Sequence, residues 1–133
     1  MRSFPLEIVT PDGLAWEGEA ESLLIRTTDG DVEILAGHTD FVATLSIGRA
    51  RILKDGKNEY ASVQGGFITV AGGDVKVVAT TFELAQNIDT ERARRAKEKA
   101  EAEKAKAKSS RDFALAEARL KRALNRINVA SMK

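Results

Sequence analysis

Few side chains in this sequence could perform chemistry, and this limits the reactions open to the protein. The 133 residues include no cysteine and a single histidine, His38. Thiolate catalysis and thiolate metal sites are therefore excluded, and any Ser/His/Asp triad would have to use His38. The twenty Asp and Glu residues are scattered, and no pair of them stands out as a general acid and a general base. We therefore expect no catalytic residues and no metal site.

Basic side chains, which could bind an anionic ligand or partner, are concentrated toward the carboxyl end. Residues 84–133 contain fourteen Lys or Arg and seven Asp or Glu, a net charge of +7. Residues 1–83 contain seven Lys or Arg and thirteen Asp or Glu, a net charge of −6. All ten glycines and both prolines lie before Asp74. Such a change in charge and composition indicates two modules with different partners.

The first module has the pattern of an all-β domain. Phe4, Leu6 and Ile8 alternate with other side chains, and six further short segments are rich in β-branched or aromatic residues, namely 23–27, 41–45, 49–53, 60–63, 67–70 and 75–80. Regular spacing of this kind favours a sandwich or barrel. Asp55-Gly56 and Gly72-Gly73 predict hairpin turns between such segments. Gly65-Gly66 predicts a bulge or a close backbone approach, because no phosphate-binding motif surrounds it.

The second module changes to a helical period at Thr90. Asp89 is the candidate N-cap, Glu91 favours the positive end of the helix dipole, and Ala93 and Ala100 lie along one face together with Ala96. After Ser109-Ser110 we expect a second helix from about Arg111, with an apolar seam of Phe113, Leu120, Leu124 and Ile127. The two segments predict an αα-hairpin.

Packing within this hairpin is expected to be weak. Between Thr90 and Asp112 there is no Leu, Ile, Val, Phe or Met. The first helix can therefore bury only alanine methyl groups, each contributing about 0.8 kcal/mol. Both segments could stay helical while their mutual packing is exchanged for packing on a partner, which makes a conformational switch physically plausible.

Five motifs in a fixed order carry a resemblance to a known family. They are Val9-Thr10-Pro11-Asp12-Gly13, the segment 30–38 against a pattern close to GxxGILPGH, Gly65-Gly66-Phe67, the segment 88–93 with the pattern IDxxRA, and the segment 120–126. In this order they resemble the epsilon subunits of bacterial F-type ATP synthases. Two positions depart from the pattern, since Glu33 replaces a glycine and Ala36 replaces a proline.

The resemblance implies a fold and a role. The fold is a ten-stranded β-sandwich over residues 1–85, followed by an antiparallel two-helix hairpin over residues 86–133. The sandwich would join the gamma subunit to the c-ring of a proton-translocating enzyme. The hairpin would lie folded down, or extend toward the alpha and beta subunits and inhibit ATP hydrolysis. The protein would be non-catalytic and peripheral, on the cytoplasmic face of the bacterial cell membrane.

The resemblance also implies three sets of contact residues. ATP, as a regulatory ligand with the role of Mg²⁺ left open and no obligatory cofactor, would bind Glu83, Ile88, Asp89, Arg92, Ala93, Arg122 and Arg126, with Lys99 where relatives often have arginine. Asp31 and His38 would lie in a loop that contacts the c-ring. The extended hairpin would contact the catalytic subunits through Arg111, Arg119, Lys121, Arg122 and Arg126.

Two other interpretations of the basic module stay open at this point. Asp89 can be an N-cap alone and the arginines a solvated face. The hairpin could also lie along nucleic-acid phosphates as a binding module, although the interspersed Glu98, Glu101, Glu103 and Glu117 argue against it. The amino terminus lacks the features of a signal peptide, and no apolar stretch approaches the ~18 residues that span a bilayer. We therefore expect no direct insertion into a bilayer.

Overall fold

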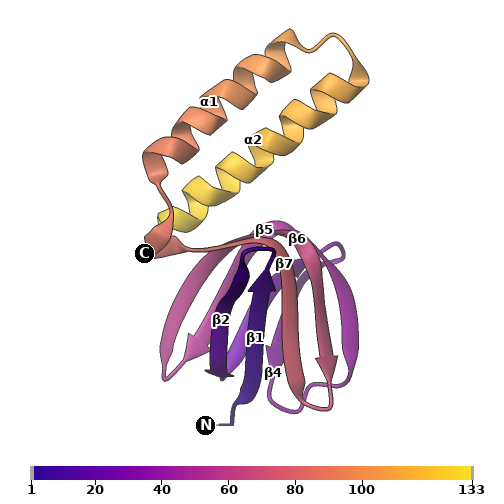
Figure 1. The fold of residues 1–133 in the computed structure, drawn as a ribbon, viewed down its shortest axis with the longest axis vertical. Helices are drawn as coiled ribbons and strands as arrows, with labels where there is room; N and C mark the ends of the chain where they lie inside the picture. The colour runs from indigo at the N-terminus through magenta and orange to yellow at the C-terminus, as the bar shows by residue number, and fades with distance from the viewer. Residues whose placement is uncertain (1, 133) are drawn as a thin grey trace. The chain divides into compact units, whose positions relative to one another are not determined.

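The computed structural model describes residues 2–132, which divide into two compact units at Leu84 (Figure 1). The first unit, Met1–Leu84, contains the strands β1 Phe4–Thr10, β2 Gly13–Ala20, β3 Ser22–Thr27, β4 Gly30–Leu35, β5 Phe41–Lys54, β6 Lys57–Ala71 and β7 Asp74–Leu84. The second unit, Ala85–Lys133, contains a 3-10 turn, η1 Ala85–Asn87, and the helices α1 Thr90–Lys106 and α2 Ser110–Ala130.

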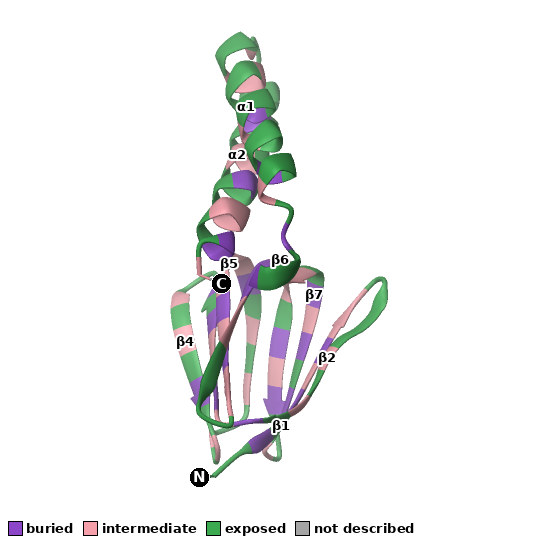
Figure 2. Ribbon diagram, turned by 90° about the vertical axis from the view of Figure 1, so that its left-hand side faces the viewer, coloured by how far each residue is buried: buried purple, intermediate pink, exposed green. Residues whose placement is uncertain are grey.

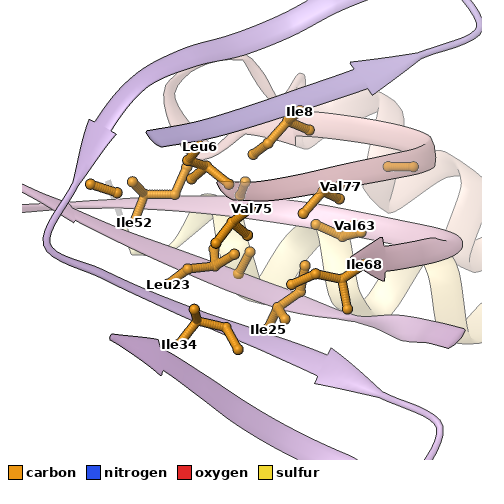
Figure 3. Packing of buried hydrophobic residues seen from close by; sticks show 14 of the residues in the cluster. Leu6, Ile8, Leu23, Ile25, Ile34, Ile52, Val63, Ile68, Val75 and Val77 are labelled. Atoms are coloured by element: carbon orange, nitrogen blue, oxygen red, sulfur yellow. The ribbon is translucent and has the colours of Figure 1, made fainter. Parts of the chain in front are cut away.

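The first unit is one sheet folded over on itself into a sandwich. Its strand order is β2-β1-β7-β6-β5-β3-β4, and among the strands described in residues 2–132 only β1 and β7 pair in parallel. Side chains from both layers point toward one another and fill the space between them (Figure 3). The fully buried large residues of this core are Leu6, Ile8, Leu23, Ile25, Ile34, Ile52, Val63, Ile68 and Val77.

The described residues form seven strands, so the expected count of ten is wrong. The expected segments 41–45 and 49–53 are parts of β5, and 60–63 and 67–70 are parts of β6, which have 14 and 15 residues. The ladder between β5 and β6 lapses between Thr44 and Gly48 and resumes in the same register. The backbone thus stays extended through the bend, and two expected strands become one.

Glycines allow the bends and turns that the sequence predicts. Asp55 and Gly56 have φ of 53° and 74°, and Gly72 and Gly73 have 59° and 88°, so both pairs form the expected hairpin turns. At Gly66, φ is 107° and a Cβ would collide with the carbonyl oxygen of Val78 on β7. The expectation of a close backbone approach at Gly66 is therefore confirmed.

Strand β2 is held to β5 by a cation and an aromatic ring. The Nζ of Lys54 lies 5.5 Å from the centre of the Trp16 ring, a distance at which the cation and the ring attract each other. Gly18 lies beneath, and a Cβ there would come within 2.9 Å of that Nζ. Trp16 also packs against the core and is partly buried there.

The second unit is a helical hairpin whose helices begin where the sequence predicts. Asp89 caps α1, and its carboxylate accepts a hydrogen bond from the backbone N–H of Arg92 at 3.1 Å. Ser109 caps α2, and its hydroxyl accepts from the N–H of Asp112 at 3.0 Å. Both side chains satisfy N–H groups that the first helical turn leaves without partners.

The fully buried positions of the seam between the helices are alanines. They recur at intervals of seven, as Ala93 and Ala100 on α1 and Ala116, Ala123 and Ala130 on α2. Leu120 and Ile127 of the expected α2 seam are half-buried, and Ala96 of the expected α1 face is exposed. Methyl groups let two helices approach closely, and longer side chains are then displaced to the flanks. Phe113 and Leu124 of the expected seam are accordingly 43% and 45% exposed. Figure 2 shows exposed positions along most of both helices.

Candidate functional site

The candidate ATP-binding residues are divided between the two units. Glu83 lies in β7 of the first unit, half-buried and opposite Ser62 in the β6–β7 ladder. Ile88 precedes α1, Asp89 caps it, and Arg92, Ala93 and Lys99 lie on it. Arg122 and Arg126, four residues apart on α2, complete the set.

The register of the hairpin sets which turns of α1 and α2 lie side by side. Arg119 Nη1 lies 2.8 Å from Glu103 Oε2, and Lys104 Nζ lies 3.7 Å from Glu117 Oε2. Continued along the antiparallel helices, this register places the turn around Arg122 beside the turn around Lys99. Arg122 and Lys99 are exposed, so both are available to an anionic ligand.

The apolar members of the set are covered. Ile88 is 3% exposed and Ala93 is 0% exposed. An adenine ring can therefore contact these two side chains only after the groups that cover them move. In the folded hairpin the set offers guanidinium and ammonium groups for phosphates, and it offers no open apolar surface at Ile88 and Ala93.

The candidate c-ring residues do not share a loop, which corrects that expectation. Asp31 lies in β4, because Val32 and Ile34 of the 30–35 segment alternate inward while Asp31 and Glu33 face outward. His38 lies in the following loop, where its Nδ1 is 2.7 Å from the carbonyl oxygen of Thr39. At about 3.3 Å per residue, the strand from Asp31 to Leu35 spans about 13 Å, so it keeps the two side chains apart.

Asp31 is engaged in an ion-pair network within its own unit. Its carboxylate accepts two hydrogen bonds from Arg26, at 2.8 and 3.3 Å, and lies 3.8 Å from Arg49 Nη1. The hydrogen bond from Arg26 and the two positive charges outweigh partial burial and hold the pKa of Asp31 below its ordinary value. Glu33, one of the two departures from the family pattern, accepts from Arg51 Nη2 at 2.7 Å.

The basic residues expected to meet the catalytic subunits only partly share a face. Arg119, Arg122 and Arg126 are spaced three and four residues apart, which aligns them along α2. Lys121 is two residues beyond Arg119 and therefore points elsewhere. Arg111 lies in the first turn of α2 and is exposed.

The outer face of the sandwich carries an apolar row that the sequence analysis missed. The ladders place Leu14, Val9, Val78 and Phe67 side by side across β2, β1, β7 and β6, on the side away from the core. Leu14 is 58% exposed and Phe67 is 45% exposed, and Val42 of β5 nearby is 74% exposed. The available signal was that these strands carry apolar residues at both alternating sets of positions.

Comparison with known proteins begins with family models. Residues 3–85 match the model of the ATP synthase delta/epsilon chain, beta-sandwich domain, and residues 86–131 match that of the long alpha-helix domain of the same chain. The ATP synthase epsilon chain of Bacillus cytotoxicus is 44% identical over 133 residues, with both chains fully covered. The chain belongs to the ATP synthase epsilon family. The epsilon chain of Bacillus mycoides, 41% identical over 133 residues with both chains fully covered, gives the same result.

Solved structures support the fold of this epsilon chain. A chain in the Euglena gracilis mitochondrial ATP synthase, OSCP/F1/c-ring in rotational state 1, superposes with a TM-score of 0.83 at 23% identity, covering 98% of this chain and 82% of that one. A chain in the Tetrahymena thermophila mitochondrial ATP synthase, central stalk/c-ring, superposes with a TM-score of 0.65 at 12% sequence identity, covering 97% of this chain and 97% of that one.

Membership of the epsilon family settles the class of function. The protein is a non-catalytic subunit of the ATP synthase central stalk, and the resemblance stated from its motifs is confirmed. The comparisons give no support to the nucleic-acid hypothesis. Neither of the helices within residues 2–132 is long and apolar enough to cross a membrane.

Proposed function

We propose that the sandwich joins the gamma subunit of the stalk to the c-ring, on the cytoplasmic face of the bacterial membrane. The observation that carries this proposal is the outer apolar row, Leu14, Val9, Val78 and Phe67. A contiguous exposed apolar surface marks an interaction site on a small protein. The row lies on a rigid sheet, which suits a part that must transmit torque, and the loop of His38 is free to make a separate contact with the c-ring.

The hairpin is proposed to act as the regulatory arm. Its alanine seam buries little apolar area, while Phe113 and Leu124 are half exposed on its flanks. Apolar groups that the folded hairpin leaves uncovered could be buried by a partner, which favours an extended arm against the alpha and beta subunits. In that state the arm would block ATP hydrolysis, with Arg119, Arg122 and Arg126 facing acidic groups.

ATP is proposed to stabilise the folded hairpin. The register set by the ion pairs Arg119–Glu103 and Lys104–Glu117 puts the turns of Lys99 and Arg122 beside each other, so a triphosphate could bridge α1 and α2 there. Helices that separate would lose this bridge. ATP then shifts the population toward the folded form by its differential affinity for the two forms, and low ATP releases the arm.

Titration of ATP into the isolated protein tests this ligand. We expect saturable heat with the wild type, with and without Mg²⁺, and at least tenfold weaker binding in Arg92→Ala, because the loss of one charge-assisted contact costs about 1.5 kcal/mol or more. Arg94→Ala is the matched control, since Arg94 already forms an ion pair with Glu91, with its Nη1 2.9 Å from Glu91 Oε1. Absence of heat at millimolar ATP would leave an arm that responds only to its neighbours.

Binding to purified gamma subunit tests the docking face. Phe67→Ser should raise the dissociation constant at least tenfold, because an aromatic side chain at the centre of an interface commonly contributes more than about 1.4 kcal/mol. Leu35→Ser is the control, since Leu35 is 51% exposed but lies on β4 at the far edge of the sheet. Equal affinities for the wild type and Phe67→Ser, measured by surface plasmon resonance, would remove this face from the interface.

A further inference from the structure

The outer face continues beyond the apolar row into a row of charges. In the ladders Glu7 of β1 lies opposite Glu17 of β2 on one side and Lys76 of β7 on the other. One row further, Glu19 lies opposite Pro5. The apolar and charged rows are therefore consecutive on one surface, since Glu7 and Val9 are two residues apart on β1.

These rows form a groove with an acidic lining. It has a volume of about 450 Å³ and is lined by Pro5, Leu6, Glu7, Glu17, Gly18, Glu19, Asp74, Val75 and Lys76. Four carboxylates and one ammonium group give it a net charge of −3. Lys76 Nζ lies 3.5 Å from Glu7 Oε1, and the hydroxyl of Ser3 donates to Glu19 Oε1 at 3.2 Å.

The carboxylates are placed unfavourably for the folded protein alone. Like charges that face each other on paired strands repel, and Glu7 and Glu17 are such a pair. One lysine at 3.5 Å compensates only part of this charge. An additional cation bound in the groove would relieve the repulsion.

The lining indicates what kind of cation fits. Pro5, which is exposed, gives the groove an apolar wall beside its carboxylates, whereas Leu6 and Val75 are only 2% and 3% exposed because their side chains belong to the core. Lys and Arg side chains bury an aliphatic stem along such surface while the charged head meets carboxylates. A metal ion fits less well, because the described residues contain no group of three or more ligating side chains that could hold one.

We propose that the acidic groove receives Lys or Arg side chains of the stalk subunit that docks on the adjacent apolar row. This inference rests on the proposed docking role of the sandwich and adds the chemistry that orients it. The apolar row supplies the centre of the interface and the groove its charged rim, which is the usual anatomy of a protein interface. Charges at a rim act mainly on the rate of association and on its dependence on salt.

The double variant Glu17→Gln/Glu19→Gln separates this proposal from a structural role. We expect the melting temperature of the isolated protein to stay level or rise by about 2–4 °C, because a like-charge contact is lost. The association rate with purified gamma subunit at low salt should fall about tenfold, and its salt dependence should flatten. A variant with the same charge change elsewhere, Asp29→Asn/Asp55→Asn, alters exposed turn residues and should leave the salt dependence unchanged.

The outcomes are distinct. An unchanged association rate of Glu17→Gln/Glu19→Gln at every salt concentration would overturn the proposal that the groove binds cationic side chains. The docking role of the apolar row would then still be decided by the affinity of Phe67→Ser. A lowered melting temperature would overturn the view that the carboxylates repel one another. Failure of the wild type to bind gamma subunit would instead defeat the proposed function itself.

Discussion

Replacement of Gly66 by alanine is expected to destabilise the sandwich by about 3 kcal/mol or more, through backbone strain and a steric clash together. At φ of 107° an L-residue is strained, and the new Cβ would meet the backbone of Val78 and Ala79 on β7. A side chain can rotate away from a clash, but a paired strand cannot, so β6 and β7 would have to separate. These two strands are neighbours at the centre of the sheet order.

Chemical denaturation of Gly66→Ala and of Gly56→Ala gives a matched comparison. Gly56 also has a positive φ, 74°, but a Cβ there would meet nothing within 4 Å. The Gly56 variant therefore reports the cost of conformation alone, expected to be about 1 kcal/mol. The excess measured for Gly66→Ala combines the cost of separating the strands with the greater strain of a φ of 107°. Equal midpoints for the two variants would show that the sheet accommodates the added methyl group.

Enlargement of the alanine seam is expected to open the hairpin. Ala123 is 3% exposed at the seam, so Ala123→Leu inserts three further carbons where the two helices are closest. Overpacking of this kind costs about 1–3 kcal/mol. That is comparable with what a few alanine methyl groups contribute, at about 0.8 kcal/mol each, so the population of separated helices should rise at least fivefold.

Distances between spin labels measure this opening directly. The chain contains no cysteine, so cysteines placed at the exposed positions Glu98 and Lys121 would be the only attachment points. We expect a broad, longer distance distribution in Ala123→Leu and an unchanged one in Ala114→Leu, whose added side chain lies on the exposed side of α2. Identical distributions in both variants would mean that the seam is not what holds the helices together.

The sequence predicts the elements with strong local signals and misses those that depend on tertiary context. Asp89 and Ser109, the two caps, follow from side-chain chemistry within three residues. The sequence does not predict the edge strands β2 and β4. In β2 only Trp16 and Ala20 alternate inward among polar or small neighbours, and in β4 only Val32 and Ile34 do so, in a segment that the family resemblance places in a loop. The weak pattern is a consequence of position, because an edge strand exposes most of its side chains.

The candidate sites depended on tertiary packing even more strongly. The sequence shows that α1 can offer only alanines, and periodicity identifies an apolar seam of Phe113, Leu120, Leu124 and Ile127 on α2. It does not show that α2 meets those alanines with Ala116 and Ala123 and leaves Phe113 and Leu124 exposed. The outer row of the sandwich arises from pairing between four strands, so its members are dispersed in sequence from Val9 to Val78. No local pattern joins residues that meet only through a ladder.

The lysine above the Trp16 ring has a practical consequence. Trp16 is the single tryptophan of the chain, and it lies in the first unit against Lys54 and the core. Both α-helices lie in the second unit. Tryptophan emission therefore follows the sandwich alone, while helical circular dichroism follows the hairpin alone. The protein carries two natural, independent optical signals, so its two units can be melted and compared in one unlabelled sample.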